Sequence, residues 1–462
     1  MKRLFALATL FSLILINRAS ADSPPALPTL IGDIIVVDDA SVWNVGGISV
    51  AYNSTDDEFR VFWFDSRIED QNDVYSQRLS TLGELLGANL TICAGIPSYS
   101  TTACAYDPIA NQYFFVCRYQ NGGPGTEGFN HAYGGLVSAR GGLINGLTDV
   151  CNGGLEPTLA YNSVDQQFFL EARNFYGGGA EGIRGQRFDR DGNVIGGGVT
   201  ITNTDWPAPC GQVCYNSNAN QYLATWREQS NENLQGRIIN ADGTFATSAF
   251  VISTMFPESV LAASAAFDPV NDRYLVLWSG FYGGGAYGQF LSLTGAPVGG
   301  PFMVFEPDGY RLKTFVAYDP VNRVYLAAWQ DLLDVWVQLL SDSGELLGDP
   351  INLGGYPDGS PRVAVNTTSG GFLVVWWDRT YVDNNNVLAQ LVGVEPEFMI
   401  GDVNCDGVIN NFDINPFVLA LTNPAGYAAQ YPGCDIMLAD TSGDGVVNNF
   451  DISPFVGLLT AP

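Results

Sequence analysis

The chain is poor in basic residues and has almost no histidine. Its 462 residues include 20 Lys and Arg against 48 Asp and Glu, a net charge of −28, and one histidine, His131. Because a chain with this negative charge repels the phosphate backbone of DNA and RNA, we expect no nucleic-acid partner. One histidine excludes mechanisms that need two, and a Ser-His-Asp triad would depend on His131, which we expect on an exposed loop.

Long apolar runs are absent after the first 21 residues. The chain opens with Lys2 and Arg3, a largely apolar stretch from Leu4 to Ile16, and the small residues 19–21. This order is typical of a secretory signal peptide, residues 1–21. No later run reaches the roughly 18 apolar residues that suggest a transmembrane helix. We therefore expect a secreted chain, extracellular or cell-surface associated, without a transmembrane segment.

The eight cysteines include no CxxC pair with zinc-site spacing, and all of them follow the predicted signal peptide. An even number of cysteines in an oxidising compartment favours disulfides over thiol chemistry. Cys405 and Cys434 are the only two near the C-terminus, so we expect them to pair. The other six allow several pairings: Cys93, Cys104, Cys117, Cys151, Cys210 and Cys214.

An acidic dodecapeptide occurs twice near the C-terminus, as DVNCDGVINNFD at 402–413 and DTSGDGVVNNFD at 440–451. Both copies have oxygen-bearing side chains at positions one, three, five, nine and twelve and glycine at position six, the pattern of a calcium loop. Position seven would supply a main-chain carbonyl. The pattern predicts two bound Ca²⁺ ions. The expected ligands are Asp402, Asn404, Asp406, Val408, Asn410 and Asp413, then Asp440, Ser442, Asp444, Val446, Asn448 and Asp451.

Only an exiting helix is expected after each loop, because Pro396 and an irregular segment precede the first loop. A loop followed by a helix, repeated twice at the end of the chain, resembles a dockerin domain, here residues 397–462. The resemblance implies a cohesin-like receptor or another surface protein as partner. The sequence departs from cellulosomal dockerins at Asn411-Phe412 and Asn449-Phe450, where those domains usually carry small recognition residues, and it lacks their basic residues.

Between these ends the sequence repeats about every 50 residues. Six units begin with an aromatic residue and the seventh with Val365; each then has a turn, an aromatic residue seven positions on and, in five units, tryptophan four positions later. Two strands around a turn and two further strands per unit predict a four-stranded propeller blade. The second aromatics are Phe59, Tyr113, Phe168, Tyr222, Tyr274, Tyr325 and Phe372, and the tryptophans are Trp63, Trp226, Trp278, Trp329 and Trp376.

The seventh unit lacks its fourth strand, and a matching segment lies at the other end of the chain. Residues 31–53 align with residues 347–366, so residues 31–40 are predicted to complete the last blade and close the ring. The alternative is an open β-solenoid. The predicted fold is mainly β: a seven-bladed β-propeller over residues 22–396, followed by a small α-helical calcium-binding domain. The repeats resemble a repeat abundant in secreted bacterial proteins, which implies a propeller but no defined activity.

Two sets of residues are candidates for a ligand-binding face on the propeller. Carboxylates follow the repeat tryptophan by two positions in four blades: Asp65, Glu228, Asp331 and Asp378. A pair of such acids could act as in a glycosidase, although nearby arginines favour a structural role. The motif FYGGG occurs twice and offers Phe175, Tyr176, Phe281 and Tyr282 for stacking on sugar rings, or for packing between adjacent loops.

The sequence thus predicts a non-catalytic propeller that binds a glycan or a protein and is tethered through a calcium-dependent, dockerin-like tail. The alternative is an enzyme, a glycoside hydrolase of polysaccharide catabolism acting on O-glycosyl bonds. Carboxylates roughly 5 to 10 Å apart in an open pocket would favour the enzyme. Acids bonded to neighbouring arginines would favour the binding protein.

Overall fold

The computed structural model describes most of the chain after the predicted signal peptide. The described residues form two compact units, one of them Ala26–Glu395 and the other containing Pro396–Pro462. The described residues are 26–38, 45–68, 71–96, 101–120, 130–152, 155–174, 182–203, 213–228, 233–254, 263–280, 285–306, 313–331, 334–355, 361–380, 384–396, 399–432 and 434–460.

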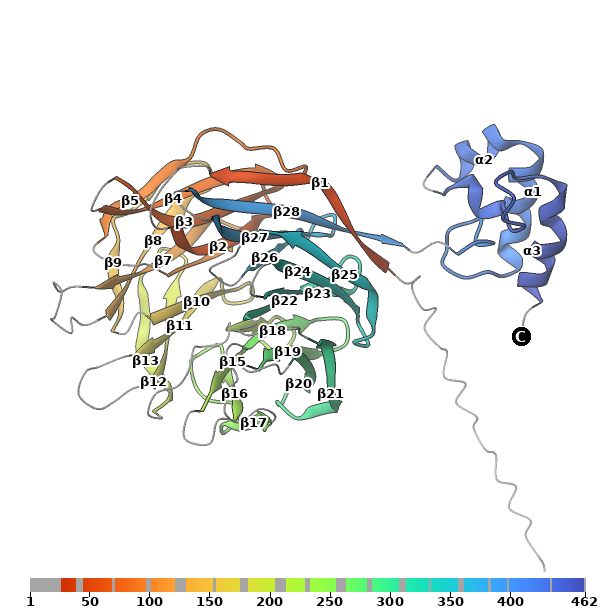
Figure 1. Ribbon diagram of the computed structural model, residues 1–462. Coiled ribbons are helices and arrows are strands. Elements are labelled where there is room, and N and C mark those ends of the chain that lie inside the picture. Colours follow the sequence, from red (N-terminus) through yellow and green to blue (C-terminus); the bar gives the residue numbers. More distant parts are fainter. Residues whose placement is uncertain are drawn as a thin grey trace, which may run out of the picture. The chain divides into compact units, whose positions relative to one another are not determined.

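Unit Ala26–Glu395 is a β-propeller of seven four-stranded antiparallel sheets arranged around a central axis (Figure 1). Blades one to four contain β2 (Val45–Asn53), β3 (Glu58–Ile68), β4 (Gln71–Ser80) and β5 (Leu90–Ile96); β6 (Thr102–Asp107), β7 (Gln112–Gln120), β8 (Asn130–Ser138) and β9 (Thr148–Asn152); β10 (Leu155–Asn162), β11 (Gln167–Asn174), β12 (Gly182–Asp189) and β13 (Val194–Thr202); and β14 (Cys214–Asn216), β15 (Gln221–Arg227), β16 (Leu234–Asn240) and β17 (Phe250–Ser253). Blades five to seven contain β18 (Ala263–Asp268), β19 (Arg273–Ser279), β20 (Ala286–Ser292) and β21 (Pro297–Phe305); β22 (Lys313–Asp319), β23 (Val324–Gln330), β24 (Val335–Ser341) and β25 (Leu346–Gly354); and β26 (Arg362–Val365), β27 (Phe372–Thr380), β28 (Asn384–Pro396) and β1 (Ala26–Asp38).

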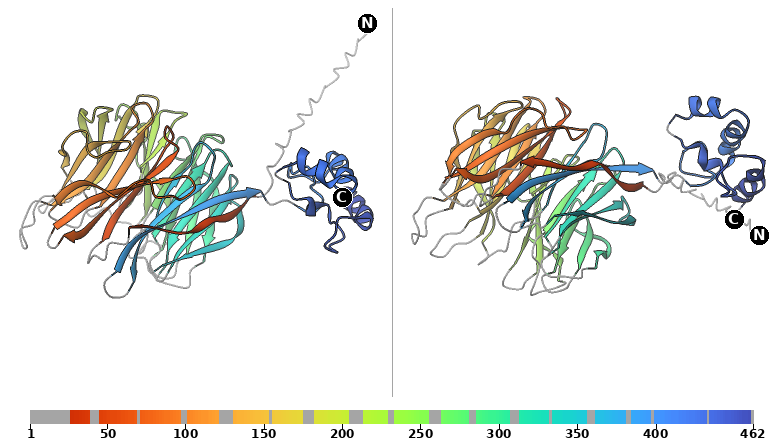
Figure 2. Two further views of the ribbon diagram at one scale, coloured as in Figure 1. Left: turned by 90° about the horizontal axis from the view of Figure 1, so that it is seen from above. Right: turned by 45° about the horizontal axis from the view of Figure 1, so that its top comes forward.

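The ring closes through the N-terminal strand. The last sheet has the order β1-β28-β27-β26, so β1 supplies its outermost strand, and both views in Figure 2 show β1 beside β28. The innermost strands β26 and β2 also contact each other across the junction between the last and first blades. The predicted closure is therefore confirmed for the described residues 31–38, and the alternative of an open β-solenoid is wrong.

Each blade begins with the same hairpin, and this explains the repeated turn sequences. The first residue of the turn is Asn or Asp, and its side-chain oxygen accepts the main-chain N–H groups two and three positions later. The residue four positions on has a positive φ, as at Asn111 (48°) and Asp272 (52°). The seven turn residues are Asn53, Asp107, Asn162, Asn216, Asp268, Asp319 and Asn366.

Aromatic side chains fill the spaces between blades. The five repeat tryptophans are at most 1% exposed, and the second strands are buried on both faces because each blade is packed between two others. Phe169 of blade three stacks on Tyr222 of blade four with ring centroids 4.5 Å apart. The hydrophobic clusters therefore lie between blades. This explains why the second strand of each blade has apolar residues on both of its faces.

The C-terminal unit is helical and small. It contains η1 (Asn411–Asp413), α1 (Ile414–Thr422), α2 (Pro424–Gln430), η2 (Ile436–Ala439), η3 (Asn449–Asp451) and α3 (Ile452–Leu459). Helices α1 and α3 follow the two acidic loops, as expected, and α2 was not expected. The rings of Phe417 and Phe455 lie parallel, with centroids 3.9 Å apart. Among the described residues, no helix has the length and apolarity needed to cross a bilayer.

Candidate metal centre and propeller surface

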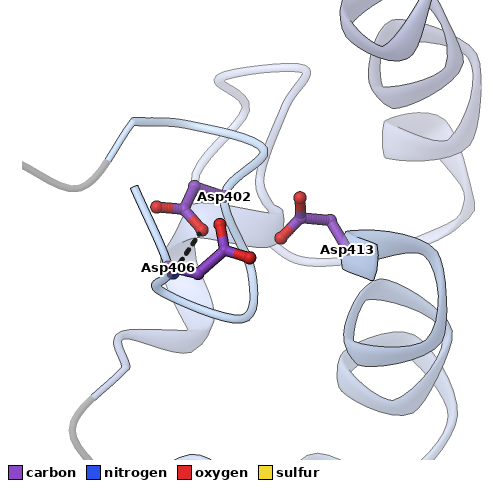
Figure 3. A group of neighbouring side chains, drawn as sticks. All are labelled: Asp402, Asp406 and Asp413. Atoms are coloured by element: carbon purple, nitrogen blue, oxygen red, sulfur yellow. Dashed lines mark hydrogen bonds between the residues drawn. The ribbon is translucent and has the colours of Figure 1, made fainter. Parts of the chain in front are cut away.

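The first acidic loop brings three carboxylates together (Figure 3). Asp402, Asp406 and Asp413 each offer an oxygen, and these oxygens lie within 4.8 Å of one another. Asp402 and Asp413 are fully buried, whereas Asp406 is exposed. Burial raises the pKa of both Asp402 and Asp413, against hydrogen bonds from main-chain N–H groups that lower it. Buried acids that repel one another are an arrangement that a bound cation would stabilise.

Main-chain donors orient these carboxylates. The amide of Gly407 donates to Asp402 Oδ2 at 2.8 Å, and the amides of Asn404 and Asn410 donate to Asp413 at 3.0 and 2.8 Å. Gly407 has φ +85°, a conformation that glycine adopts without strain. The loop therefore curls around a point that is lined with oxygens.

The second loop repeats this scheme 38 positions later. Gly445 (φ +84°) donates to Asp440 Oδ2 at 2.7 Å, and the amides of Ser442 and Asn448 donate to Asp451 at 2.9 and 2.7 Å. Asn410 and Asn448 also cap the short helices η1 and η3 in the same way. The atoms that could ligate a metal in the two loops are all oxygens, which fits a hard cation such as calcium.

Cys405 and Cys434 form a disulfide, in agreement with the expected pairing, with their Cα atoms 5.8 Å apart. In the propeller, Cys93, Cys104 and Cys214 carry free thiols, so the expectation of disulfides is wrong for these three. Burial raises the pKa of Cys104 and of Cys214 to about 12, which makes both thiols poor nucleophiles. Cys210 lies outside the described residues.

The four candidate carboxylates of the propeller are buried or hydrogen-bonded to neighbouring residues. Asp65 is fully buried and accepts hydrogen bonds from the indole of Trp63 and from Arg67. Asp331 accepts the amide of Asp334 and the indole of Trp336, each at 2.8 Å. Glu228 and Asp378 are at most 5% exposed. For Asp65, the bond to a neighbouring arginine is the observation expected of a binding protein rather than a glycosidase.

Two further predictions on the propeller have different outcomes. His131 lies on strand β8, not on a loop, and its Nδ1 is 2.7 Å from Asp149 Oδ2, so its predicted place is wrong. The strand forms there because residues 130–138 pair with both β7 and β9. Phe175, Tyr176, Phe281 and Tyr282 lie outside the described residues.

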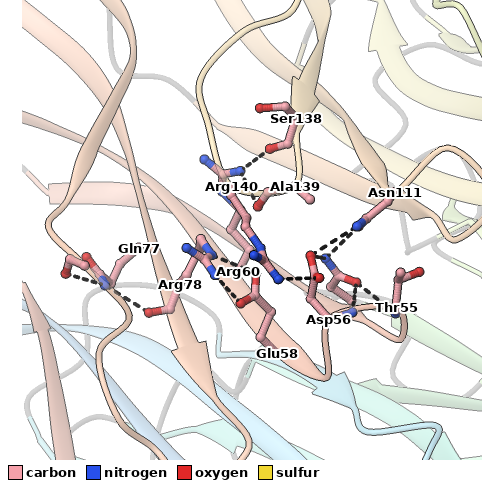
Figure 4. Close-up of polar contacts among 12 residues, drawn as sticks. Thr55, Asp56, Glu58, Arg60, Gln77, Arg78, Asn111, Ser138, Ala139 and Arg140 are labelled. Atoms are coloured by element: carbon pink, nitrogen blue, oxygen red, sulfur yellow. Dashed lines mark hydrogen bonds and ion pairs between the residues drawn. The ribbon is translucent and has the colours of Figure 1, made fainter.

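Sequence reasoning missed two buried charged residues of the propeller. Arg60 is fully buried in blade one and donates to the main-chain oxygens of Ser138 and Ala139 in blade two (Figure 4). It also donates to the main-chain oxygen of Gly141, and burial lowers the pKa of Arg60 to about 10. Glu171 on β11 is also fully buried, and neither carboxyl oxygen has a hydrogen-bond partner. Burial raises the pKa of Glu171 well above its usual value. The signal for both was a charged residue with apolar neighbours on the second strand, Phe59 and Val61 beside Arg60 and Leu170 and Ala172 beside Glu171.

Comparison with known proteins supports the fold and assigns no family. No protein-family model and no curated protein matches the chain. A protein of unknown function from Dyadobacter fermentans superposes with a TM-score of 0.50 at 11% identity, covering 80% of this chain and 99% of that one. The WD40 domain of Toxoplasma gondii coronin gives a TM-score of 0.50 at 8% identity, covering 81% and 88%. Because WD40 domains are β-propellers, this likeness agrees with the propeller fold, and at such identities it shows the fold alone.

Proposed function

We propose that the chain is a secreted binding protein whose propeller engages a glycan or a protein and whose C-terminal unit is a calcium-dependent, dockerin-like docking module. The observation that carries this proposal is the repeated loop. Two oxygen-only loops share the same hydrogen-bond scheme, and in the first loop three carboxylate oxygens lie within 4.8 Å. Asp402, Asp406 and Asp413 would hold one ion together with Asn404, Asn410 and the carbonyl of Val408.

The second ion would lie in the equivalent loop, held by Asp440, Asp444, Asp451 and their neighbours Ser442, Asn448 and the carbonyl of Val446. Residues 401–462 contain seven Asp and no Glu, Lys or Arg, so bound cations would relieve the repulsion within this unit. When bound, calcium would supply charge neutralisation and fix the loops ahead of α1 and α3.

A docking role is supported by two matching exposed aromatics. Phe412 and Phe450 occupy the same position of the two loops, and each is 77% exposed. Large apolar side chains so exposed are typical of protein-binding surfaces. The partner would be a cohesin-like receptor or another surface protein with an apolar pocket, tethering the propeller to a cell surface or a multiprotein assembly.

The hydrolase alternative has no supporting observation among the described residues. Asp65 is buried and bonded to Arg67, and Asp331 is bonded to a main-chain amide and an indole. Acids held in this way are not free to protonate a glycosidic oxygen or to attack a sugar.

Calcium binding to the whole mature chain tests the proposal. Isothermal titration calorimetry should find two calcium ions per chain, and Asp402→Ala and Asp440→Ala should each remove one. Asp435→Ala is the control, because Asp435 caps η2 and lies outside both loops. In scanning calorimetry, chelator should lower the transition of the C-terminal unit and leave the propeller transition in place. A chain that binds no calcium at millimolar concentration would exclude the proposal.

A further inference from the structure

The two loops differ at their fourth position, where the backbone turns between two expected ligands. In the second loop this residue is Gly443, with φ +73°. In the first loop it is Cys405, with φ +57°, between Asn404 and Asp406. The left-handed region is unfavourable for a residue with a Cβ atom, which comes close to the following carbonyl oxygen, whereas glycine adopts it freely. The first loop therefore needs a conformation that its own residue disfavours.

The disulfide holds Cys405 in that conformation. It joins Cys405 to Cys434, and both lie against the core of the C-terminal unit beside Val403 and Tyr427. The hydroxyl of Tyr427 donates to the carbonyl oxygen of Val403 at 3.0 Å. Both sulfur atoms lie within 4 Å of the main-chain oxygen of Asp402, at 3.8 and 3.9 Å. The bridge thus fixes the backbone after Asn404, at Cys405, and the Tyr427 hydrogen bond holds the backbone before it, at Val403.

We propose that the Cys405–Cys434 disulfide is a positioning element for the first calcium site: it holds the loop in its metal-binding conformation and thereby raises the calcium affinity of that loop alone. This inference rests on the proposed calcium function. The second loop obtains the same backbone conformation from Gly443 and has no covalent link, so its affinity is independent of the bridge. The chain thus contains a matched internal control.

The experiment measures calcium binding to each loop separately in the whole mature chain. Asp440→Ala leaves the first loop as the binding site, and Asp402→Ala leaves the second. In each background the bridge is removed in two ways, as Cys405→Ser with Cys434→Ser and as Cys405→Gly with Cys434→Ser. Both pairs delete the disulfide, but only the second restores a residue that tolerates positive φ. Isothermal titration calorimetry with calcium chloride gives the dissociation constants.

In the Asp440→Ala background, the serine pair should weaken calcium binding about tenfold, the equivalent of about 1.4 kcal/mol. The glycine pair should recover most of that loss. In the Asp402→Ala background, neither pair should change the affinity, which also shows that the unit remains folded without the bridge.

The inference would be overturned, with the calcium function intact, if the serine pair left the first-loop affinity unchanged or if the glycine pair bound calcium no better than the serine pair. Weakening of the second loop by the same factor would also overturn it, because the bridge would then stabilise the whole unit. If the Asp440→Ala chain with its disulfide binds no calcium while the Asp402→Ala chain does, the first site itself is wrong. No binding to the unmodified chain would refute the proposed function.

Discussion

The side-chain amide of Gln390 donates to the main-chain oxygen of Ile31, 359 residues earlier, at 3.1 Å. Gln390 lies on β28 and Ile31 on β1, so this bond ties the end of the propeller to its beginning. In blade six, Gln338 makes the same kind of bond to Leu347, only nine residues away. A hydrogen bond that joins the third and outermost strands within a repeat therefore links the two ends of the propeller in the last blade.

We expect Gln390→Ala to lower the free energy of unfolding of the propeller by about 0.5–1.5 kcal/mol, because the part-buried hydrogen bonds to the main-chain oxygens of Ile31 and Gly32 are lost. Urea denaturation measures this change. Gln338→Ala is the control, with a similar local loss but no effect on ring closure. Limited proteolysis should therefore cleave the N-terminal strand faster only in Gln390→Ala. Equal cleavage in both variants would contradict a role of Gln390 in closure.

We expect Arg67 to contribute far more to the stability of the propeller than a typical surface arginine does. It bonds the buried Asp65 and reaches Asp38 at 2.5 Å at the end of β1, and its guanidinium lies 3.6 Å from the ring centroid of Tyr75. Arg67→Ala would leave two buried carboxylates without their cation, so we expect a loss of about 3–5 kcal/mol in urea denaturation.

The matched control for Arg67 is Arg140→Ala. Arg140 pairs with Asp56 at 2.7 Å, but its side chain is 68% exposed. Asp56 is 12% exposed but keeps hydrogen bonds from the side-chain amides of Asn53 and Asn111, so loss of the exposed Arg140 should cost only about 0–1 kcal/mol. Equal losses for the two variants would show that burial of the acids is not the cause.

Glu171 should make the stability of the propeller depend on pH. Its pKa is raised in the folded chain, so the folded state binds a proton more tightly than the unfolded state. The contribution of Glu171 is therefore most favourable below the unfolded pKa of about 4.3 and is lost as the pH rises toward the folded pKa, by up to about 1.4 kcal/mol per pH unit. Urea denaturation of the unmodified chain and of Glu171→Gln at several pH values measures the difference. A constant difference from pH 5 to pH 8 would refute the prediction.

Phe412 and Phe450 should be needed for docking and not for folding. Because each ring is 77% exposed, the double change to alanine should leave the melting temperature within about 2 °C. Capture of the chain by native surface proteins in the presence of calcium should fall at least tenfold, measured by quantitative pull-down with and without chelator. Leu82→Ala is the control, because Leu82 is equally exposed, at 78%, but lies on the propeller. Unchanged capture by the double variant would place the docking surface elsewhere.

The sequence by itself determined the repeating architecture and the two loops. Seven repeats, six of them with an aromatic residue on both sides of the turn, predict seven blades, because each unit must bury both faces of its second strand against neighbours. The missing fourth strand of the last unit and its counterpart at residues 31–40 predict ring closure. Asp402, Asp406 and Asp413 were identifiable as candidate ligands because the oxygens of a twelve-residue calcium loop have fixed spacing, and the pairing of Cys405 with Cys434 because no other cysteine lies near them.

Only the tertiary structure decided what depends on contacts between distant residues. From the sequence alone, Asp65 could be a catalytic acid or the partner of an arginine in an ion pair. Its hydrogen bonds from Trp63 and Arg67 favour the ion pair. The strand pattern predicts a buried position for Glu171, but it does not show that neither carboxyl oxygen finds a hydrogen-bond partner there, because the pattern does not say which polar groups lie opposite. Cys405 likewise gives no sign in the sequence of its positive φ. The structure shows both that conformation and the disulfide that links Cys405 to Cys434, 29 positions away.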